Sequence, residues 1–410
     1  MSDSPNLAPS SPSKNRLVSI DAARGIVMGL MIFTNDLTDI PRVPRWLEHF
    51  GPGDGLTLKD LIFPAFLFIV GMSIPLALGP RLNRGERWPA VLGHVAVRAL
   101  SLLFLGIIML HESPDAAALG WSPDLWTVLF YLLAIVAFGE IKSRPRLSSS
   151  LRKAGLAAVL ILAWVFRGSH GSRIFTLVPL SVDVQWYGIL GEIGWAYLVA
   201  SIVFLLFRGR RTALLGCAVL LMCLYPADIA GMFSSIHFLV VGGHLGSRPA
   251  IAVAGILLGT AMTSPDIALP GQRLRFALLF IAGCAAAAVL VRAPYGINKP
   301  LATPAWCLWA CASAAALWLV CWWALDRGAI PGIGRPLAAA GKNVLLAYLL
   351  SEGKNSFLDL IQIGKFNLGS AYGALAHFSL PVATVRCAVC AVVVLAITSG
   401  INRLGFRMRL

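Results

Sequence analysis

The stretch DLIFPAFLFIVGMSIPLALG, residues 60–79, decides the class of fold, because Asp60 is its only charged residue. A helix needs about 20 mostly apolar residues to cross a bilayer, and this stretch meets that requirement. The whole chain has the same character: of its 410 residues, 58% are hydrophobic and 13% are charged. Soluble domains carry about 25% charged residues. The composition therefore excludes both an ordinary cytosolic enzyme and a disordered protein.

About twelve comparable stretches follow one another along the chain. The predicted spans are 17–37, 60–79, 90–110, 124–141, 152–166, 185–207, 212–231, 248–263, 273–292, 302–325, 336–352 and 378–400. We therefore expect an all-α polytopic integral membrane protein of about 10–12 transmembrane helices, forming one domain over residues 16–410. Residues 1–15 are polar and rich in Ser and Pro, so we expect them to be a disordered tail.

Basic residues are concentrated in alternate loops between these spans. The chain has 34 Lys and Arg against 19 Asp and Glu, a net charge of +15. The basic clusters all fall on one side if the spans are counted as above; they are Arg81, Arg84 and Arg87, then residues 142–153, 208–211, 273–275, 327–335 and 403–409. The positive-inside rule then places both termini in the cytoplasm. The charge excess indicates membrane topology and no nucleic-acid partner.

Small and sulfur-containing residues are expected to serve helix packing. The eight cysteines all lie in apolar spans, and the pair Cys387 and Cys390 lacks the further ligands of a metal or redox site. We therefore predict no metal site. Gly25 with Gly29, and Gly255 with Gly259, have the spacing that lets two helices approach closely.

Polar residues within or beside the apolar spans are the candidate functional groups, because charge at membrane depth is costly. In RLVSIDAARGIVMGLMIFTND, residues 16–36, Asp21 and Arg24 open the span and Asn35 stands near its end. Asp21 fits a helix N-cap, with Arg24 extending its side chain toward water, as well as it fits a functional role.

The loop before the second span holds a histidine. His49 lies between two spans, and Asp60 follows at the start of the next helix, where an N-cap explains it equally well. A histidine in a loop is commonly only solvated. An imidazole, however, titrates near neutral pH, which suits a general base.

Two later segments add further polar groups. In YGINKPLATPAW, residues 295–306, Asn298 and Lys299 precede a span on the outer side. In GKNVLLAYLLSE, residues 341–352, Lys342 and Asn343 lie within an apolar stretch and Glu352 stands at its outer end. A buried asparagine needs a partner, which can be another helix or a ligand.

Together these segments resemble the heparan-α-glucosaminide N-acetyltransferase family and its bacterial relatives. The family opening R-x-x-S-x-D-x-x-R-G corresponds to Arg16–Gly25, and the family Asn and loop His correspond to Asn35 and His49. The motif G-L-T-x-x-D-L-x-F-P runs here from Gly55 to Pro64. The later matches are Asn298 with Lys299, and Asn343 followed by Tyr348 and Glu352.

The resemblance implies a membrane acyltransferase that takes an acetyl group from cytoplasmic acetyl-CoA. The acceptor is an amino sugar or glycan on the periplasmic side of a bacterial inner membrane. The resemblance makes His49 the general base and Asn35 its partner, which donates to the oxyanion or orients the donor. Asp60 would hold the tautomer of His49, as in a catalytic triad. The remaining expected site residues are Asn298, Lys299, Asn343, Glu352, Asp21 and Arg24 for the substrate pocket and Arg81, Arg84 and Arg87 for the phosphates of CoA.

Several alternatives stay open at this point. The transfer can proceed directly or through an acetyl-histidine, and the acceptor atom can be nitrogen or oxygen. A secondary transporter of a small sugar or organic solute would also have about twelve spans and a basic inner face. Membrane lipid is an expected partner, and a homodimer is compatible with the sequence.

Overall fold

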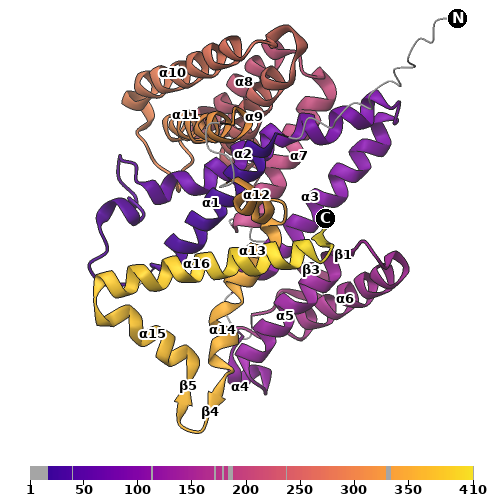
Figure 1. The fold of residues 1–410 in the computed structure, drawn as a ribbon, viewed down its shortest axis with the longest axis vertical. Coiled ribbons are helices and arrows are strands. Elements are labelled where there is room, and N and C mark those ends of the chain that lie inside the picture. Colours follow the sequence, from indigo (N-terminus) through magenta and orange to yellow (C-terminus); the bar gives the residue numbers. More distant parts are fainter. Residues whose placement is uncertain are drawn as a thin grey trace, which may run out of the picture.

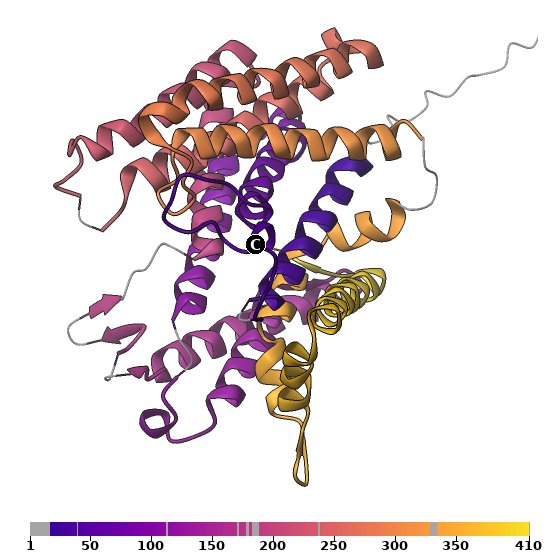
Figure 2. The same ribbon diagram turned by 90° about the vertical axis from the view of Figure 1, so that its left-hand side faces the viewer.

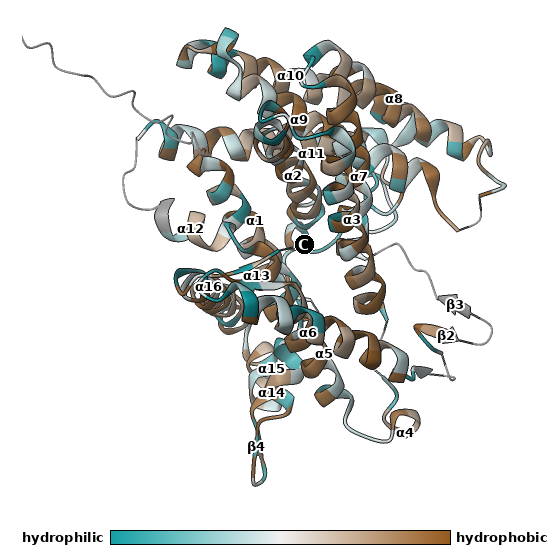
Figure 3. Ribbon diagram, turned by 90° about the vertical axis from the view of Figure 1, so that its right-hand side faces the viewer, coloured by the Kyte–Doolittle hydropathy of each residue, from teal (hydrophilic) through white to brown (hydrophobic). Residues whose placement is uncertain are grey.

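The protein is built almost entirely of helices, as Figure 3 shows together with the apolar residues that cover most of them. The structure is a computed structural model, and it describes residues 17–409 except 39, 112–113, 170–171, 178–179, 183–187, 237 and 329–333. The predicted tail at residues 1–15 lies outside the described residues. In the part of the chain that is described, 10 helices are long and apolar enough to cross a membrane. The prediction of an all-α polytopic membrane protein is thus confirmed.

The long helices are α1 (Val18–Asp36), α2 (Leu58–Asn83), α3 (Trp88–Leu110), α6 (Pro145–Val165), α7 (Ile189–Phe207), α8 (Arg211–Ile229), α9 (Arg248–Thr263), α10 (Pro270–Tyr295), α11 (Pro304–Cys321) and α16 (Leu380–Arg403). A π-helical turn, Val241–Ser247, precedes α9, and another, Trp322–Asp326, follows α11. The shorter helices are α4 (Ala116–Leu119), α5 (Pro123–Phe138), α12 (Gly334–Gly341), α13 (Val344–Glu352), α14 (Lys354–Asp359) and α15 (Leu368–Phe378), with 3-10 turns at Arg45–Leu47 and Pro265–Ile267. The strands among the described residues form three antiparallel pairs, β1 (Gly139–Ile141) with β6 (Phe406–Met408), β2 (Phe175–Leu177) with β3 (Leu180–Val182), and β4 (Gln362–Ile363) with β5 (Phe366–Asn367).

Each predicted span coincides with a helical segment, with one correction of substance. The expected helix 336–352 is broken into α12 and α13 at Lys342 and Asn343. Asn343 leaves the helical ladder because its side chain accepts the backbone N–H of Met408 at 3.0 Å and reaches the carbonyl of Phe406 at 3.5 Å. The prediction of one continuous helix was wrong because these partners lie in a distant strand.

Helices α2 and α9 form the centre of the bundle. Most of α2 and nearly all of α9 are buried, whereas α8 and α10 are largely exposed and form the periphery (Figure 1). Backbones approach closely at glycines: a Cβ on Gly255 would lie 2.1 Å from the carbonyl oxygen of Phe68, and one on Gly25 would lie 2.3 Å from that of Leu337. The predicted close packing at these two glycines is confirmed.

The basic loops gather on one side of the bundle. Strand β1, which follows α5, pairs with β6 near the C-terminus, and Asp326 accepts the backbone N–H of Val18 at the start of α1. We call this side, with residues 81–87, 139–146 and 403–409, the basic face. The opposite side, with the loop between α1 and α2, is the His49 face. Figure 1 shows β1 and the C-terminus on the right and that loop on the left, and Figure 2 shows the loop crossing the front of the molecule.

Gly71 provides a test of the central packing. We expect Gly71→Ala to lower the midpoint of thermal unfolding in detergent, because its Cβ would lie 1.9 Å from the backbone oxygen of Ala252. Overpacking of this kind costs about 1–3 kcal/mol. Gly79→Ala is the matched control on the same helix, since a Cβ there meets no atom within 4 Å. Equal midpoints for the two variants would contradict the described contact between α2 and α9.

Candidate active site

Two loops on the His49 face are tied together and carry three of the predicted site residues, and a fourth, Asp60, lies in the first turn of α2. In the loop before α2, Asp54 accepts the backbone N–H of Ile297 at 2.7 Å and lies 3.2 Å from Nε of Arg292. These hydrogen bonds hold the pKa of the Asp54 carboxyl below its usual value, the bond from Ile297 contributing most. Gly55 donates to the carbonyl of Ile297 at 3.0 Å. The loop before α2 and the loop before α11 are therefore one structural unit.

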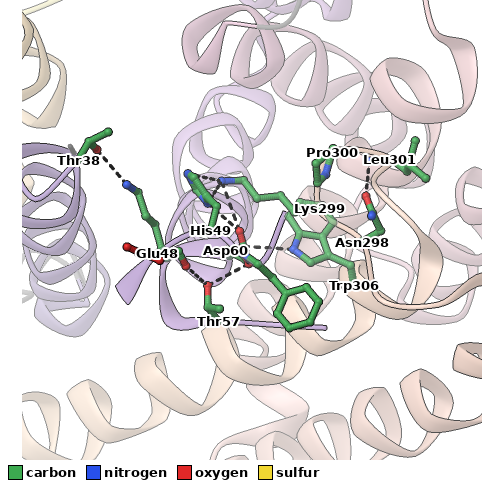
Figure 4. Close-up of polar contacts among 12 residues, drawn as sticks. Thr38, Glu48, His49, Thr57, Asp60, Asn298, Lys299, Pro300, Leu301 and Trp306 are labelled. Atoms are coloured by element: carbon green, nitrogen blue, oxygen red, sulfur yellow. Dashed lines mark hydrogen bonds and ion pairs between the residues drawn. The ribbon is translucent and has the colours of Figure 1, made fainter. Parts of the chain in front are cut away.

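His49 and Asp60 form a directly bonded pair inside this unit (Figure 4). Nδ1 of His49 lies 2.7 Å from one carboxylate oxygen of Asp60. The other oxygen accepts the backbone N–H of Phe50 at 3.0 Å and has the Thr57 hydroxyl 2.9 Å away. Asp60 is 4% exposed and His49 is 49% exposed. A carboxylate that accepts Nδ1–H leaves Nε2 as the basic nitrogen, so the pair has the geometry of a general base with its orienting acid.

Lys299 completes this group from the other loop. Its Nζ lies 3.2 Å from Nδ1 of His49 and 3.9 Å from the Asp60 carboxylate. Burial lowers the pKa of Lys299 to about 8, and the Asp60 carboxylate opposes that shift. An ammonium group beside an imidazole can stabilise negative charge that develops during a reaction there.

Asn298 holds the turn that carries Lys299. Its amide nitrogen donates to the carbonyl of Gly53 at 3.2 Å, and its oxygen accepts the backbone N–H of Leu301 at 2.9 Å. The side chain is buried. Of the two residues predicted to line the substrate pocket here, Lys299 reaches the reactive group, and Asn298 fixes the loop.

Asn35 and Glu352 form a second group on the same side of the molecule. The side chain of Asn35 lies within hydrogen-bonding reach of Glu352, so the structure brings these two predicted site residues together. Asn35 also lines a polar cavity of about 310 Å³, together with residues of α14, α15 and α16. A hydrogen bond from Lys59 Nζ to Thr38 Oγ1, 3.0 Å long, connects the rim of this cavity to the residue beside Asp60.

Sequence reasoning missed the charged cluster at this cavity. The side chain of Asp36 contacts the ammonium of Lys354 and the hydroxyl of Tyr372. The backbone oxygen of Asp36 accepts a hydrogen bond from Nη2 of Arg386 at 2.8 Å. The signal was present, because Asp36 adjoins Asn35 and Arg386 stands inside the apolar stretch 378–400. An arginine at such a position is costly unless it has a partner.

A larger cavity of about 950 Å³ opens at the basic face. Its polar lining includes the predicted residues Asp21 and Arg24, whose side chains pair at 2.9 Å. Its cations also include Arg84, Arg98, Lys342 and Arg409, of which only Arg84 was predicted to meet phosphate. Arg81 is engaged with Glu86 at 2.9 Å, and Arg87 is exposed at the start of α3. Asn343 lines the cavity as well as binding β6.

The cavity reaches far into the bundle toward the His49 face. Its lining includes Met31 near the end of α1 and Phe66 of α2. Phe66 is six residues from Asp60, which is about 9 Å along a helix at 1.5 Å per residue. A ligand that enters from the basic face can therefore extend toward the His49–Asp60 pair.

Comparisons with known proteins agree with the resemblance predicted from the motifs. Heparan-alpha-glucosaminide N-acetyltransferase of Mus musculus is 34% identical over 140 residues, which are 32% of this chain and 21% of the mouse protein. The protein of that name in Homo sapiens is 37% identical over 107 residues, which are 26% of this chain and 16% of the human protein. The matched part thus spans about a fifth or less of these relatives. A family model described as Domain of unknown function (DUF5009) matches residues 16–228. Because that match covers more than half of the chain, the chain belongs to the DUF5009 family.

Proposed function

We propose that the protein is a membrane acetyltransferase that moves an acetyl group from acetyl-CoA to an amino sugar or glycan. The observation that carries this proposal is the His49–Asp60–Lys299 group, toward which a cavity extends from the opposite face. The similarity to the two acetyltransferases supports the same reaction class. By the positive-inside rule the basic face is cytoplasmic, and the His49 face is then periplasmic in a bacterial inner membrane.

The donor binds in the large cavity at the basic face. Its volume of about 950 Å³ is within the range of small-molecule and cofactor sites, and its cations suit a ligand that carries phosphates. We assign the phosphates of CoA to the side chains Arg84, Arg98, Lys342 and Arg409. Arg24 is bonded to Asp21 and contacts Ser73, and it borders the path of the thioester arm toward His49.

The reaction needs a deprotonated acceptor, a stabilised oxyanion and a donor held in line. Nε2 of His49 removes the proton from the acceptor amine or hydroxyl while that atom attacks the thioester carbonyl. The Lys299 ammonium stabilises the tetrahedral oxyanion, and the thiolate of CoA leaves with the proton returned by the imidazolium. If the transfer passes through an acetyl-histidine, the same nitrogen is the nucleophile.

The acceptor approaches from the His49 face. The cavity of about 310 Å³ beside Asn35 is lined by Asn355, Asp359 and His377 in addition to the Asp36 cluster. Such hydrogen-bonding groups suit a hydroxylated sugar better than an apolar ligand. We assign Asn35 and Glu352 to acceptor orientation at the edge of this cavity.

The direct test is acetyl transfer by the purified protein in detergent. We expect labelled acetyl-CoA and glucosamine to give free CoA and acetylated sugar, and a panel of sugars will separate N- from O-acetylation. The absence of acetyl transfer to every acceptor would contradict the proposal. Uptake of sugar into proteoliposomes without acetyl-CoA would indicate a transporter instead.

A further inference from the structure

A buried ion pair lies behind the loop that carries Lys299. Glu192, in the first turn of α7, and Arg248, the first residue of α9, approach to 2.8 Å between Oε2 and Nε, and their side chains are 8% and 10% exposed. Two charges at such depth are costly, and well-packed apolar residues of similar volume often replace a buried pair without loss of stability. A role beyond packing therefore has to be sought in what the pair contacts.

The arginine of this pair reaches the residue next to Lys299. Nη2 of Arg248 lies 3.4 Å from the carbonyl oxygen of Pro300 and donates to it. The π-helical turn before α9 makes room for the guanidinium, since a Cβ on Gly243 would lie 2.6 Å from Nη1 of Arg248. Turns of this kind are frequent at functional sites. The guanidinium is thus held by Glu192 on one side and holds the Lys299–Pro300 turn on the other.

We propose that Glu192 and Arg248 are positioning residues for Lys299, which fix its turn and set the charge that it carries beside His49. This inference rests on the proposed function and adds to it a control on the protonation of the active site. Of the two, Arg248 contacts the loop directly, at the carbonyl of Pro300. It acts on the reaction only through Lys299.

The two members of the pair affect Lys299 with opposite sign. The charged or titratable groups that face Lys299 are His49, Lys59, Asp60, Glu192 and Arg248. Burial lowers the pKa of Lys299 to about 8, the carboxylates of Asp60 and Glu192 raise it, and the cations of Lys59 and Arg248 lower it. At neutral pH Lys299 is therefore an ammonium. A small change of local charge alters the pH at which this ammonium loses its proton.

The test is to measure how fast an amine-specific label, such as acetic anhydride, modifies Lys299 at a series of pH values in the full-length protein. Mass spectrometry gives the labelled fraction, and no acetyl-CoA is needed. We expect half-maximal labelling near pH 8 in the wild type. It should move to lower pH in Glu192→Gln and to higher pH in Arg248→Gln, each by on the order of one pH unit.

Activity supplies the second measurement. Because the ammonium stabilises the oxyanion, acetyl transfer should fall as the pH rises through about 8, and this fall should follow the labelling shifts in both variants. Lys299→Arg should remove the fall, since a guanidinium stays protonated. Arg248→Lys keeps the positive charge but loses the forked guanidinium group. We expect its activity to fall at the same pH as in the wild type, with a lower kcat.

Folding is controlled separately, because removal of one partner of a buried pair is strongly destabilising. The double variant Glu192→Gln/Arg248→Met leaves no unpaired charge, and the Kd of each variant for acetyl-CoA reports an intact cavity. Labelling profiles that stay at the wild-type pH in both single variants would overturn the inference. Shifts in labelling without any acetyl transfer by the wild type would leave the positioning intact and refute the proposed function.

Discussion

Replacing His49 by alanine should reduce kcat for acetyl transfer by about 10²–10⁴-fold, which is the usual contribution of a general base. Asp60 holds Nδ1 of His49 at 2.7 Å, and the imidazole side chain is 49% exposed. Alanine removes the proton acceptor and leaves the bonds from Phe50 and Thr57 to Asp60 in place. The Kd for acetyl-CoA should stay unchanged, because the donor is assigned to the cavity at the basic face.

The matched control is His94→Ala. His94 is exposed on α3, away from the loop before α2, and its replacement should leave kcat unchanged. If His49→Ala turns over as fast as the wild type, His49 is neither base nor nucleophile. Rapid quenching of the wild-type reaction, followed by mass spectrometry, distinguishes the two roles, since only a nucleophilic His49 carries an acetyl group during turnover.

The membrane-spanning architecture could be predicted from the sequence because hydropathy is a local property. Twenty or so apolar residues must form a helix in a bilayer wherever the rest of the chain lies. For the same reason the break in residues 336–352 could not be predicted. It depends on hydrogen bonds between Asn343 and β6. The bond to Met408 joins two residues that are 65 positions apart in the sequence.

The candidate site was predictable only where a motif marked it. His49 and Lys299 are separated by 250 residues, and no hydropathy pattern indicates that their loops meet. The motif resemblance brought both residues to attention, and the bond between Gly55 and Ile297 explains how the loops are joined. Glu192 and Arg248 belong to no such motif, and only their contact in the structure indicates a role for them.

The predicted partnership of Asn35 with His49 stays a prediction. A motif preserves the order of residues along a chain and says little about which side chains touch. Asn35 is the penultimate residue of α1 and lies beside Glu352, and residues 37–48 lead from the end of that helix to His49. We therefore expect Asn35 variants to affect the KM for the acceptor more than the ionisation of the base.

The second large effect is expected from Asp60→Asn. An amide in the place of the carboxylate can donate a hydrogen bond to Nδ1, which favours the tautomer with the proton on Nε2 and removes the base. The corresponding change in a catalytic triad lowers kcat by about 10⁴-fold. We expect a loss of about 10²–10⁴-fold with an unchanged Kd for acetyl-CoA. Glu48→Gln is the control, because Glu48 lies in the same loop and its side chain is exposed.

The double variant His49→Ala/Asp60→Asn decides whether Asp60 acts through His49. Residues that act as one unit have grossly non-additive effects, so the double variant should be about as active as His49→Ala alone. If Asp60 supported the site only by holding Phe50 and Thr57, the two losses would multiply, because the loop would fail independently of the imidazole. The kcat of the double variant divided by the kcat of His49→Ala therefore measures how much of the Asp60 effect requires the bond to Nδ1. A ratio near one assigns that carboxylate to the orientation of His49, and a ratio as small as the Asp60→Asn loss assigns it to the loop.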